Sequence, residues 1–399
     1  MKNKLSLSAV AFFLLVACST TRGAPLKVFI LSGQSNMQGH ASVTTLPSMR
    51  LDPETASILE EMVDEQGAPV ICEHVWISSI GSSEEERVGK LTAGFGPAGR
   101  GEKIGPEFTF GIYAQKLLKE PVLIIKTAWG GKSINTDFRP PSAGPYEYGE
   151  KQIESMKSRG KDVEKARADR AAASGHYYRL MMEHVKKVLG DIKRVVPGYD
   201  PEQGYELAGF VWFQGWNDMV DSGTYPQRGQ PGGYDAYSTV LADFIRDVRK
   251  DLETPDLPFV IGVMGVNGPT SLYTPDMKRY LGIHQGFRDA MAAPAALPEF
   301  KENVTAVLTE KYWDNRVTAL RKKEKGKKDE LNRQLKSKQI TRDAYNKALE
   351  EFRTQSFSEE ELELLTESTS NAEYHYMGSA RIMSQIGKAF AEAAVALGK

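Results

Sequence analysis

At residues 27–37 the chain reads Lys-Val-Phe-Ile-Leu-Ser-Gly-Gln-Ser-Asn-Met. The apolar run Lys27–Leu31 is typical of a short strand buried on both faces, and the glycine that follows it allows a tight turn. A serine just beyond the first strand of a parallel sheet lies in the crevice where such folds bind ligands. This stretch therefore predicts an α/β fold with Ser35 in a functional site.

The rest of the chain alternates short β-branched runs with helical patterns, which indicates a parallel sheet covered by helices. The final segment, about 378–397, places its apolar residues on one helical stripe. We predict a single three-layer α/β/α sandwich with a mostly parallel sheet. Further strands are expected at Cys72–Ile77, Val122–Lys126, Gly209–Phe213, Pro258–Met264 and Val304–Leu308, and further helices near residues 107–118, 174–189, 234–251 and 281–291.

Two regions interrupt this alternation. Residues 139–149 are rich in proline and glycine and are predicted to form a loop over a sheet edge, where substrate could be held. Residues 317–365 begin with a basic run and continue with helical spacing, so we predict an inserted helical hairpin. Such a charge run is typical of a solvated helix face; a docking surface for a partner or an acidic glycan is the alternative.

The N-terminus and the overall charge indicate where the protein acts. Residues 1–17 have the basic start and apolar run of a signal peptide, and Leu15-Val16-Ala17-Cys18 resembles a lipoprotein box, which implies lipid on Cys18, a linker over 18–25 and a membrane anchor. Ordinary secretion is the alternative. The main domain is expected over 26–399. With 51 basic and 52 acidic residues, the chain lacks the cationic excess of a nucleic-acid-binding protein.

Four blocks, in this order, resemble the sialate O-acetylesterase and acetylxylan esterase group, which is carbohydrate esterase family six of the SGNH hydrolase superfamily. This resemblance extends over residues 27–397 and implies a flavodoxin-like sandwich and esterase activity. The blocks are Phe-Ile-Leu-Ser-Gly-Gln-Ser-Asn-Met at 29–37, Lys-Thr-Ala-Trp-Gly-Gly-Lys-Ser at 126–133, Val-Trp-Phe-Gln-Gly-Trp-Asn-Asp at 211–218 and Ala-Glu-Tyr-His-Tyr at 372–376.

The resemblance implies Ser35 as nucleophile and His375 as its base. A serine hydroxyl attacks an ester only when an imidazole accepts its proton. The oxyanion of the tetrahedral intermediate needs preorganised donors. Those that the blocks imply are the amides of Ser35 and of Gly130 or Gly131, together with the side chain of Gln214.

One position departs from the family pattern. The superfamily usually carries an aspartate three residues before the base, where this chain has Ala372. Glu373 is the nearest carboxylate and is a candidate to orient His375, with Asp218 as the second candidate. A Ser-His dyad without a carboxylate is the third reading.

The substrate is expected to be an acetylated carbohydrate. Indole rings at strand ends can stack on a sugar, although core packing is the alternative for each of them. Arg139 could grip a carboxylate such as sialate, or form an ion pair with Asp137. No pair of residues has metal-ligand spacing, so neither a metal nor a cofactor is predicted. The residues expected to bind substrate are Gln34, Asn36, Trp129, Trp216, Asn217 and Arg139.

Two other functions remain compatible with these residues. The missing aspartate is consistent with an inactive, glycan-binding surface lipoprotein on the same scaffold. A lipase or thioesterase would share the serine chemistry but would need a long apolar slot for its acyl chain. His40, which follows Ser35 by five residues, is expected to be structural rather than a rival base.

Overall fold

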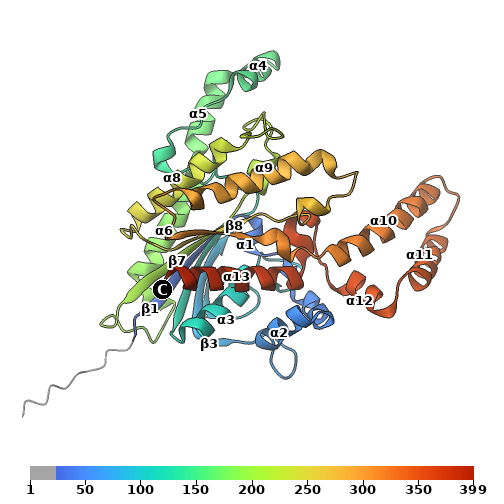
Figure 1. Ribbon diagram of the computed structural model, residues 1–399, viewed down its shortest axis with the longest axis horizontal. Coiled ribbons are helices and arrows are strands. Elements are labelled where there is room, and N and C mark those ends of the chain that lie inside the picture. The colour runs from blue at the N-terminus through green and yellow to red at the C-terminus, as the bar shows by residue number, and fades with distance from the viewer. Residues whose placement is uncertain (1–23) are drawn as a thin grey trace, which may run out of the picture.

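The computed structural model describes residues 24–399 (Figure 1); the predicted signal peptide and Cys18 lie outside the described residues. A seven-stranded sheet forms the centre, in the spatial order β4-β3-β6-β1-β7-β8-β9. Every neighbouring pair is parallel except β3 and β4, which are antiparallel. The strands are β1 (Leu26–Gly33), β3 (Cys72–Gly81), β4 (Arg87–Leu91), β6 (Val122–Ala128), β7 (Tyr205–Phe213), β8 (Phe259–Val263) and β9 (Val304–Leu308).

All six strands predicted from the sequence are present in this sheet, and the prediction of a mostly parallel α/β sheet is confirmed. The edge strand β4 was not predicted, because its five residues include Arg87, Gly89 and Lys90 and so lack the apolar run by which the other strands were recognised. A separate two-stranded sheet joins β2 (Ala41–Ser42) to β5 (Lys103–Ile104).

Helices cover both faces of the sheet. α3 (Pro106–Leu118) and α13 (Ala380–Leu397) lie on one face, and α6 (His176–Gly190), α8 (Asp235–Asp251) and α9 (Leu281–Ala292) lie on the other (Figure 1). α3 and α13 approach each other closely. A Cβ added to Gly387 of α13 would overlap the carbonyl oxygen of Pro106 of α3. The three-layer arrangement follows from this covering.

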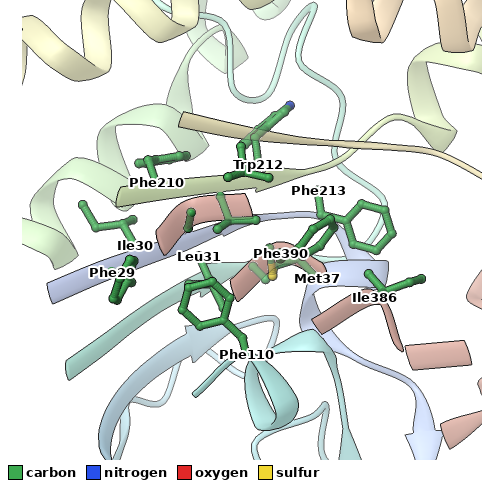
Figure 2. Packing of buried hydrophobic residues seen from close by; sticks show 14 of the residues in the cluster. Phe29, Ile30, Leu31, Met37, Phe110, Phe210, Trp212, Phe213, Ile386 and Phe390 are labelled. Atoms are coloured by element: carbon green, nitrogen blue, oxygen red, sulfur yellow. The ribbon is translucent and has the colours of Figure 1, made fainter. Parts of the chain in front are cut away.

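The core lies between the sheet and these helices (Figure 2). Phe29 of β1 packs edge-on against Phe110 of α3, with ring centroids 5.1 Å apart. Phe213 of β7 packs against Phe390 of α13 in the same manner, at 5.3 Å. On the opposite face Trp212 of β7, the neighbour of Phe213, packs against Phe244 of α8 with ring centroids 4.4 Å apart, so side chains that alternate along a strand contribute to both apolar layers.

Two helical arms project from the sandwich (Figure 1). The predicted insertion consists of α10 (Asn315–Lys336), α11 (Arg342–Ser356) and α12 (Glu359–Glu367). The second arm, α4 (Glu150–Ser158) and α5 (Val163–Ala173), directly follows the predicted loop and was not predicted. Neither of its helices has a fully buried residue, so the apolar pattern that identifies a core helix is absent.

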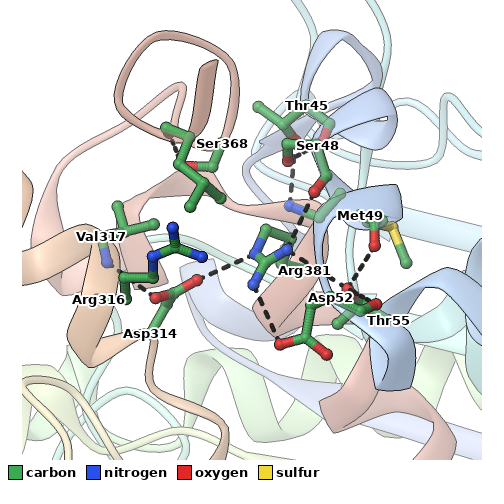
Figure 3. Close-up of polar contacts among 12 residues, drawn as sticks. Thr45, Ser48, Met49, Asp52, Thr55, Asp314, Arg316, Val317, Ser368 and Arg381 are labelled. Atoms are coloured by element: carbon green, nitrogen blue, oxygen red, sulfur yellow. Dashed lines mark hydrogen bonds and ion pairs between the residues drawn. The ribbon is translucent and has the colours of Figure 1, made fainter. Parts of the chain in front are cut away.

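The insertion is joined to the core by a buried arginine (Figure 3). Arg381 of α13 contacts Asp314, the N-cap of α10, with 3.0 Å between Nε and Oδ2. It also donates to the carbonyl of Ser48 at 3.0 Å.

The remaining short helices are α1 (Ser35–Gln38), α2 (Pro53–Met62) and α7 (Trp216–Val220). Over residues 24–399, none of the helices is both long and apolar enough to cross a membrane.

Candidate active site

Three adjacent strands end at the same level and bring the first three blocks together. Gly33 is paired with Ala128 of β6 on one side and with Phe213 of β7 on the other. The residues that follow these strands therefore line one edge of the sheet. This edge carries Ser35 after β1, Gly130 after β6 and Gln214 after β7.

Ser35 is the first residue of α1 and is 7% exposed. The turn that leads to it needs Gly33, because a Cβ there would overlap the carbonyl oxygen of Phe213. Gly130 lies beside the serine: a Cβ built on Gly130 would stand 3.8 Å from Ser35 Cβ. The Gly130 amide donates to the hydroxyl of Ser82 at 3.2 Å. The hydroxyl of Ser82, a residue that no motif had identified, thus accepts the hydrogen bond of the Gly130 amide, which is a predicted oxyanion donor.

A buried ammonium supports the far end of α1. Lys126 Nζ donates to the carbonyl of Gln38, the last residue of this helix, at 2.8 Å, and lies 2.7 Å from Glu107 Oε2. Both side chains of this ion pair are almost completely buried. Burial lowers the pKa of Lys126, while the Glu107 carboxylate acts in the opposite direction. A cation at a helix C-terminus interacts favourably with the carbonyls there.

His375 lies in a tight loop, η8 (Glu373–Gly378), immediately before α13. The next three residues, Tyr376, Met377 and Gly378, all have positive φ, between 50° and 60°. Two non-glycine residues in succession in the left-handed region are costly and persist only where their surroundings impose them. Here the buried hydroxyl of Tyr376 accepts from the Gly265 amide at 2.7 Å, which fixes the loop to the end of β8.

The nucleophile block and the histidine block meet in space. Asn36 Nδ2 donates to the carbonyl of Tyr374 at 3.2 Å. The ring of His40 is stacked on that of His375, with centroids 3.9 Å apart and planes 3° from parallel. Among the described residues no direct hydrogen bond joins Ser35 to His375; in free enzymes such catalytic hydrogen bonds are often long and form only when substrate binds.

Asn371 is the residue whose side chain is hydrogen-bonded to the imidazole of His375, and it was not predicted from the sequence. Its Oδ1 lies 3.0 Å from His375 Nδ1 and also accepts the Ala372 amide at 2.8 Å. The available signal was a polar side chain one helical turn before the histidine. That spacing alone does not predict the contact, which depends on the left-handed residues that follow His375.

Neither carboxylate predicted to orient His375 contacts it. Glu373 is exposed and pairs with Arg321 of α10, at 3.1 Å. Asp218 is completely buried and accepts from the Ile134 amide at 2.9 Å and from Gln214 Nε2 at 2.6 Å. The carboxylate of Asp218 therefore organises the loop after β6 instead.

The side chain of Gln214 is enclosed in the same buried network. Its Nε2 donates to Asp218 and to the carbonyl of Lys132, at 2.6 and 3.0 Å, so both amide hydrogens have partners within the protein. Gln34, also buried, accepts from the Gly215 amide at 3.0 Å and donates to Asn217 Oδ1 at the same distance. These residues connect the ends of β1 and β7, and their side chains are satisfied without a ligand.

The guanidinium of Arg139 is also hydrogen-bonded within the protein. It donates to the carbonyls of Gly144, Asn135 and Ala143, at 2.6, 3.1 and 2.8 Å. Asp137 accepts from the amide and hydroxyl of Ser133 and not from Arg139. Arg139 therefore holds the 139–149 loop in place and does not form the ion pair with Asp137 that the sequence offered as an alternative; its binding of a substrate carboxylate stays a prediction.

The aromatic residues divide into core and rim. Trp129 is buried against Phe138 and Tyr177. Trp216 is only partly buried and lies 5.7 Å from the ring of Tyr374. Tyr374 is 44% exposed and packs edge-on against His375 at 4.5 Å. Trp216 and Tyr374 thus form an aromatic rim beside the imidazole.

The two stacked histidines are neutral near pH 7. Burial lowers the pKa of His375 to about 4. Burial, followed by the charges of His375, Lys103 and Lys126, lowers the pKa of His40 to about 3. The neutral form is the one that accepts a proton, so His375 is a base over a wide pH range. Among the described residues, no three His, Cys, Asp or Glu side chains gather closely enough to hold a metal ion.

A cavity of about 1190 Å³ lies between α4 and the 222–227 loop and is lined in part by Arg139. Its wall includes Asn135 and Tyr225, both bonded to Asp218, but neither Ser35 nor His375. The size of this cavity alone therefore does not locate the chemistry.

Comparison with known proteins agrees with the first three blocks, whereas the fourth, at 372–376, lies beyond the matched residues. A family model described as carbohydrate esterase, sialic acid-specific acetylesterase, matches residues 25–286. No curated protein matches significantly. Among solved structures, one from Arabidopsis thaliana is 17% identical, with a TM-score of 0.37, and the match covers 71% of this chain and 86% of that one. A carbohydrate acetylesterase from Xanthomonas citri is 14% identical, with a TM-score of 0.37, and the match covers 70% of this chain and 49% of that one.

Proposed function

This chain belongs to the family of sialic acid-specific carbohydrate esterases, and we propose that it removes acetyl groups from a carbohydrate through an acetyl-enzyme on Ser35, with His375 as the base. One observation carries this assignment: residues some 340 positions apart pack together, with His375 stacked on His40 and Tyr374 bonded to Asn36. The substrate is an acetylated polysaccharide or sialoside.

The reaction proceeds in two halves. Ser35 Oγ attacks the acetyl carbonyl carbon while its proton passes to His375 Nε2. The tetrahedral intermediate collapses, the bond to the sugar oxygen breaks, and the imidazolium returns the proton to that oxygen. A water molecule, deprotonated by the same imidazole, then attacks the acetyl-serine and releases acetate and free Ser35.

The oxyanion is proposed to be stabilised by backbone amides. The Ser35 amide opens α1, and the amide of Gly130 points to an exposed hydroxyl, that of Ser82, which a substrate oxygen can replace. The Gly131 amide is the remaining candidate. Gln214 is left out of this set because both of its amide hydrogens are already bonded within the protein. A single such donor contributes about 3 to 4 kcal/mol to the transition state.

The sugar is proposed to stack on the aromatic rim of Trp216 and Tyr374. This rim is accessible and adjoins the imidazole, whereas Trp129 is enclosed in the core. An indole or phenol face suits the apolar face of a pyranose, and the polar edge of the ring can bond a hydroxyl.

We also propose export and lipid attachment at Cys18, supported by the apolar run of residues 1–17 and by the lipoprotein box that ends at this cysteine.

The test is hydrolysis by residues 24–399. The chain should cleave an aryl acetate much faster than the matching octanoyl ester, and Ser35→Ala should abolish both reactions. A strong preference for octanoyl would make the protein a lipase or thioesterase. The lack of a carboxylate next to His375, within the described residues, favours one other candidate, an inactive glycan-binding protein. That candidate predicts glycan binding without any hydrolysis that depends on Ser35.

A further inference from the structure

We propose that Asn371 is the positioning residue of this site: its side-chain oxygen holds the imidazole of His375 with the proton on Nδ1 and the free lone pair on Nε2. This inference rests on the proposed function. It assigns to Asn371 the role of orienting His375, which the aspartate absent at position 372 would otherwise have. It follows from three contacts.

The first contact settles which way the Asn371 amide points. The Ala372 N–H is a donor only, so the side-chain atom that receives it at 2.8 Å must be Oδ1. The same Oδ1 lies 3.0 Å from His375 Nδ1. An oxygen can only accept there, so Nδ1 carries the proton and Nε2 is left as the acceptor. A reversed amide would impose the opposite tautomer, which has no free lone pair on Nε2.

The second contact holds Asn371 itself in place. Its backbone amide donates to the carbonyl of Met377 at 3.0 Å, and the neighbouring Ser370 amide donates to the same carbonyl at 2.9 Å. The left-handed residues Tyr376 and Met377 turn this carbonyl back toward Asn371. The strained loop therefore places acceptor and imidazole together, which explains why its cost is tolerated.

The third contact is the His40 ring, which covers one face of the imidazole and prevents it from tilting. Within residues 24–399, no anionic side chain is hydrogen-bonded or ion-paired to His375. Tyr374 meets it edge-on, Glu373 is paired with Arg321, and the cations Lys103 and Lys126 face the His40 side. A neutral amide orients the base without stabilising its protonated form, in agreement with the low pKa of His375. The site is thus built to keep its base unprotonated in mildly acidic surroundings.

Two substitutions of nearly equal size test the proposal in residues 24–399. Asn371→Asp keeps an oxygen for both contacts but adds a negative charge, whereas Asn371→Leu removes the acceptor. We expect Asn371→Leu to lower kcat/KM for an aryl acetate at least about tenfold. Asn371→Asp should keep kcat/KM at pH 8 within about threefold of the parent, while the acidic limb of its pH profile moves up by about one unit or more.

Glu373→Gln is the matched control, since Glu373 points to Arg321; its rate and its acidic limb should equal those of the parent. Nitrogen NMR of labelled histidine should show the Nδ1–H tautomer for His375 in the parent chain and its loss in Asn371→Leu. An unshifted acidic limb in Asn371→Asp overturns the proposal, even if Asn371→Leu fails to fold. Full activity of Asn371→Leu overturns it as well. Hydrolysis that persists in Ser35→Ala would instead overturn the proposed function.

Discussion

At the scale of single residues, the chemistry depends on the surroundings of the His375 imidazole. In the described part of the chain, His375 is contacted by a carboxamide, a second imidazole and a phenol, and by no carboxylate. Desolvation acts against the charged form, so its pKa falls to about 4 instead of rising toward that of a carboxylate-paired histidine. This surrounding determines both the tautomer and the pH range of the base.

The pH profile of the unmodified chain follows from this shift. A base works only when unprotonated, so activity is present above its folded-state pKa and is lost as the pH falls through it. We expect kcat/KM for an aryl acetate to decline only near pH 4, where the desolvated His375 titrates, and not near the ordinary histidine pKa of about 6.5. A pH series of initial rates checks this; a midpoint near 6.5 would show that the imidazole is not desolvated.

Trp216 gives a second prediction at this scale. Replacing it by alanine removes half of the aromatic rim and should raise KM for an acetylated oligosaccharide about tenfold, the equivalent of about 1.4 kcal/mol of lost stacking. The change should be much smaller for methyl acetate, which is too small to reach the rim. Equal effects on both substrates would indicate damage to the site and not loss of a sugar contact.

At the scale of elements, the four-residue helix α1 is the part that needs support. It is too short to be stable by itself, and its C-terminal carbonyl is bonded to the buried ammonium of Lys126, which in turn contacts Glu107 of α3. Removing one partner leaves a buried charge without compensation.

We therefore expect Lys126→Met to lower the free energy of unfolding by about 3 kcal/mol or more, measured by denaturant titration. The double variant Lys126→Met with Glu107→Leu should recover a large part of this loss, because no charge is then buried alone. Additive losses in the double variant would mean that the two side chains act independently, against the ion pair described here.

At the scale of the whole molecule, the sequence predicted what depends on pattern. Apolar runs such as Lys27–Leu31 and Val304–Leu308 predicted the strands, and the first three blocks predicted the edge of the sheet that carries the site. The contacts of Asn371 could not be predicted, because they arise from three consecutive left-handed residues that turn the loop back on itself. Nor could those of Arg139, whose partners are carbonyls of its own loop.

The central claim is that the two ends of the described chain form one reacting pair, Ser35 and His375. Labelling with a fluorophosphonate, followed by mass spectrometry, tests this most directly. We expect a single adduct, on Ser35, whose rate of formation falls at least about a hundredfold in His375→Ala. An unlabelled Ser35, or labelling at the same rate without His375, would contradict it.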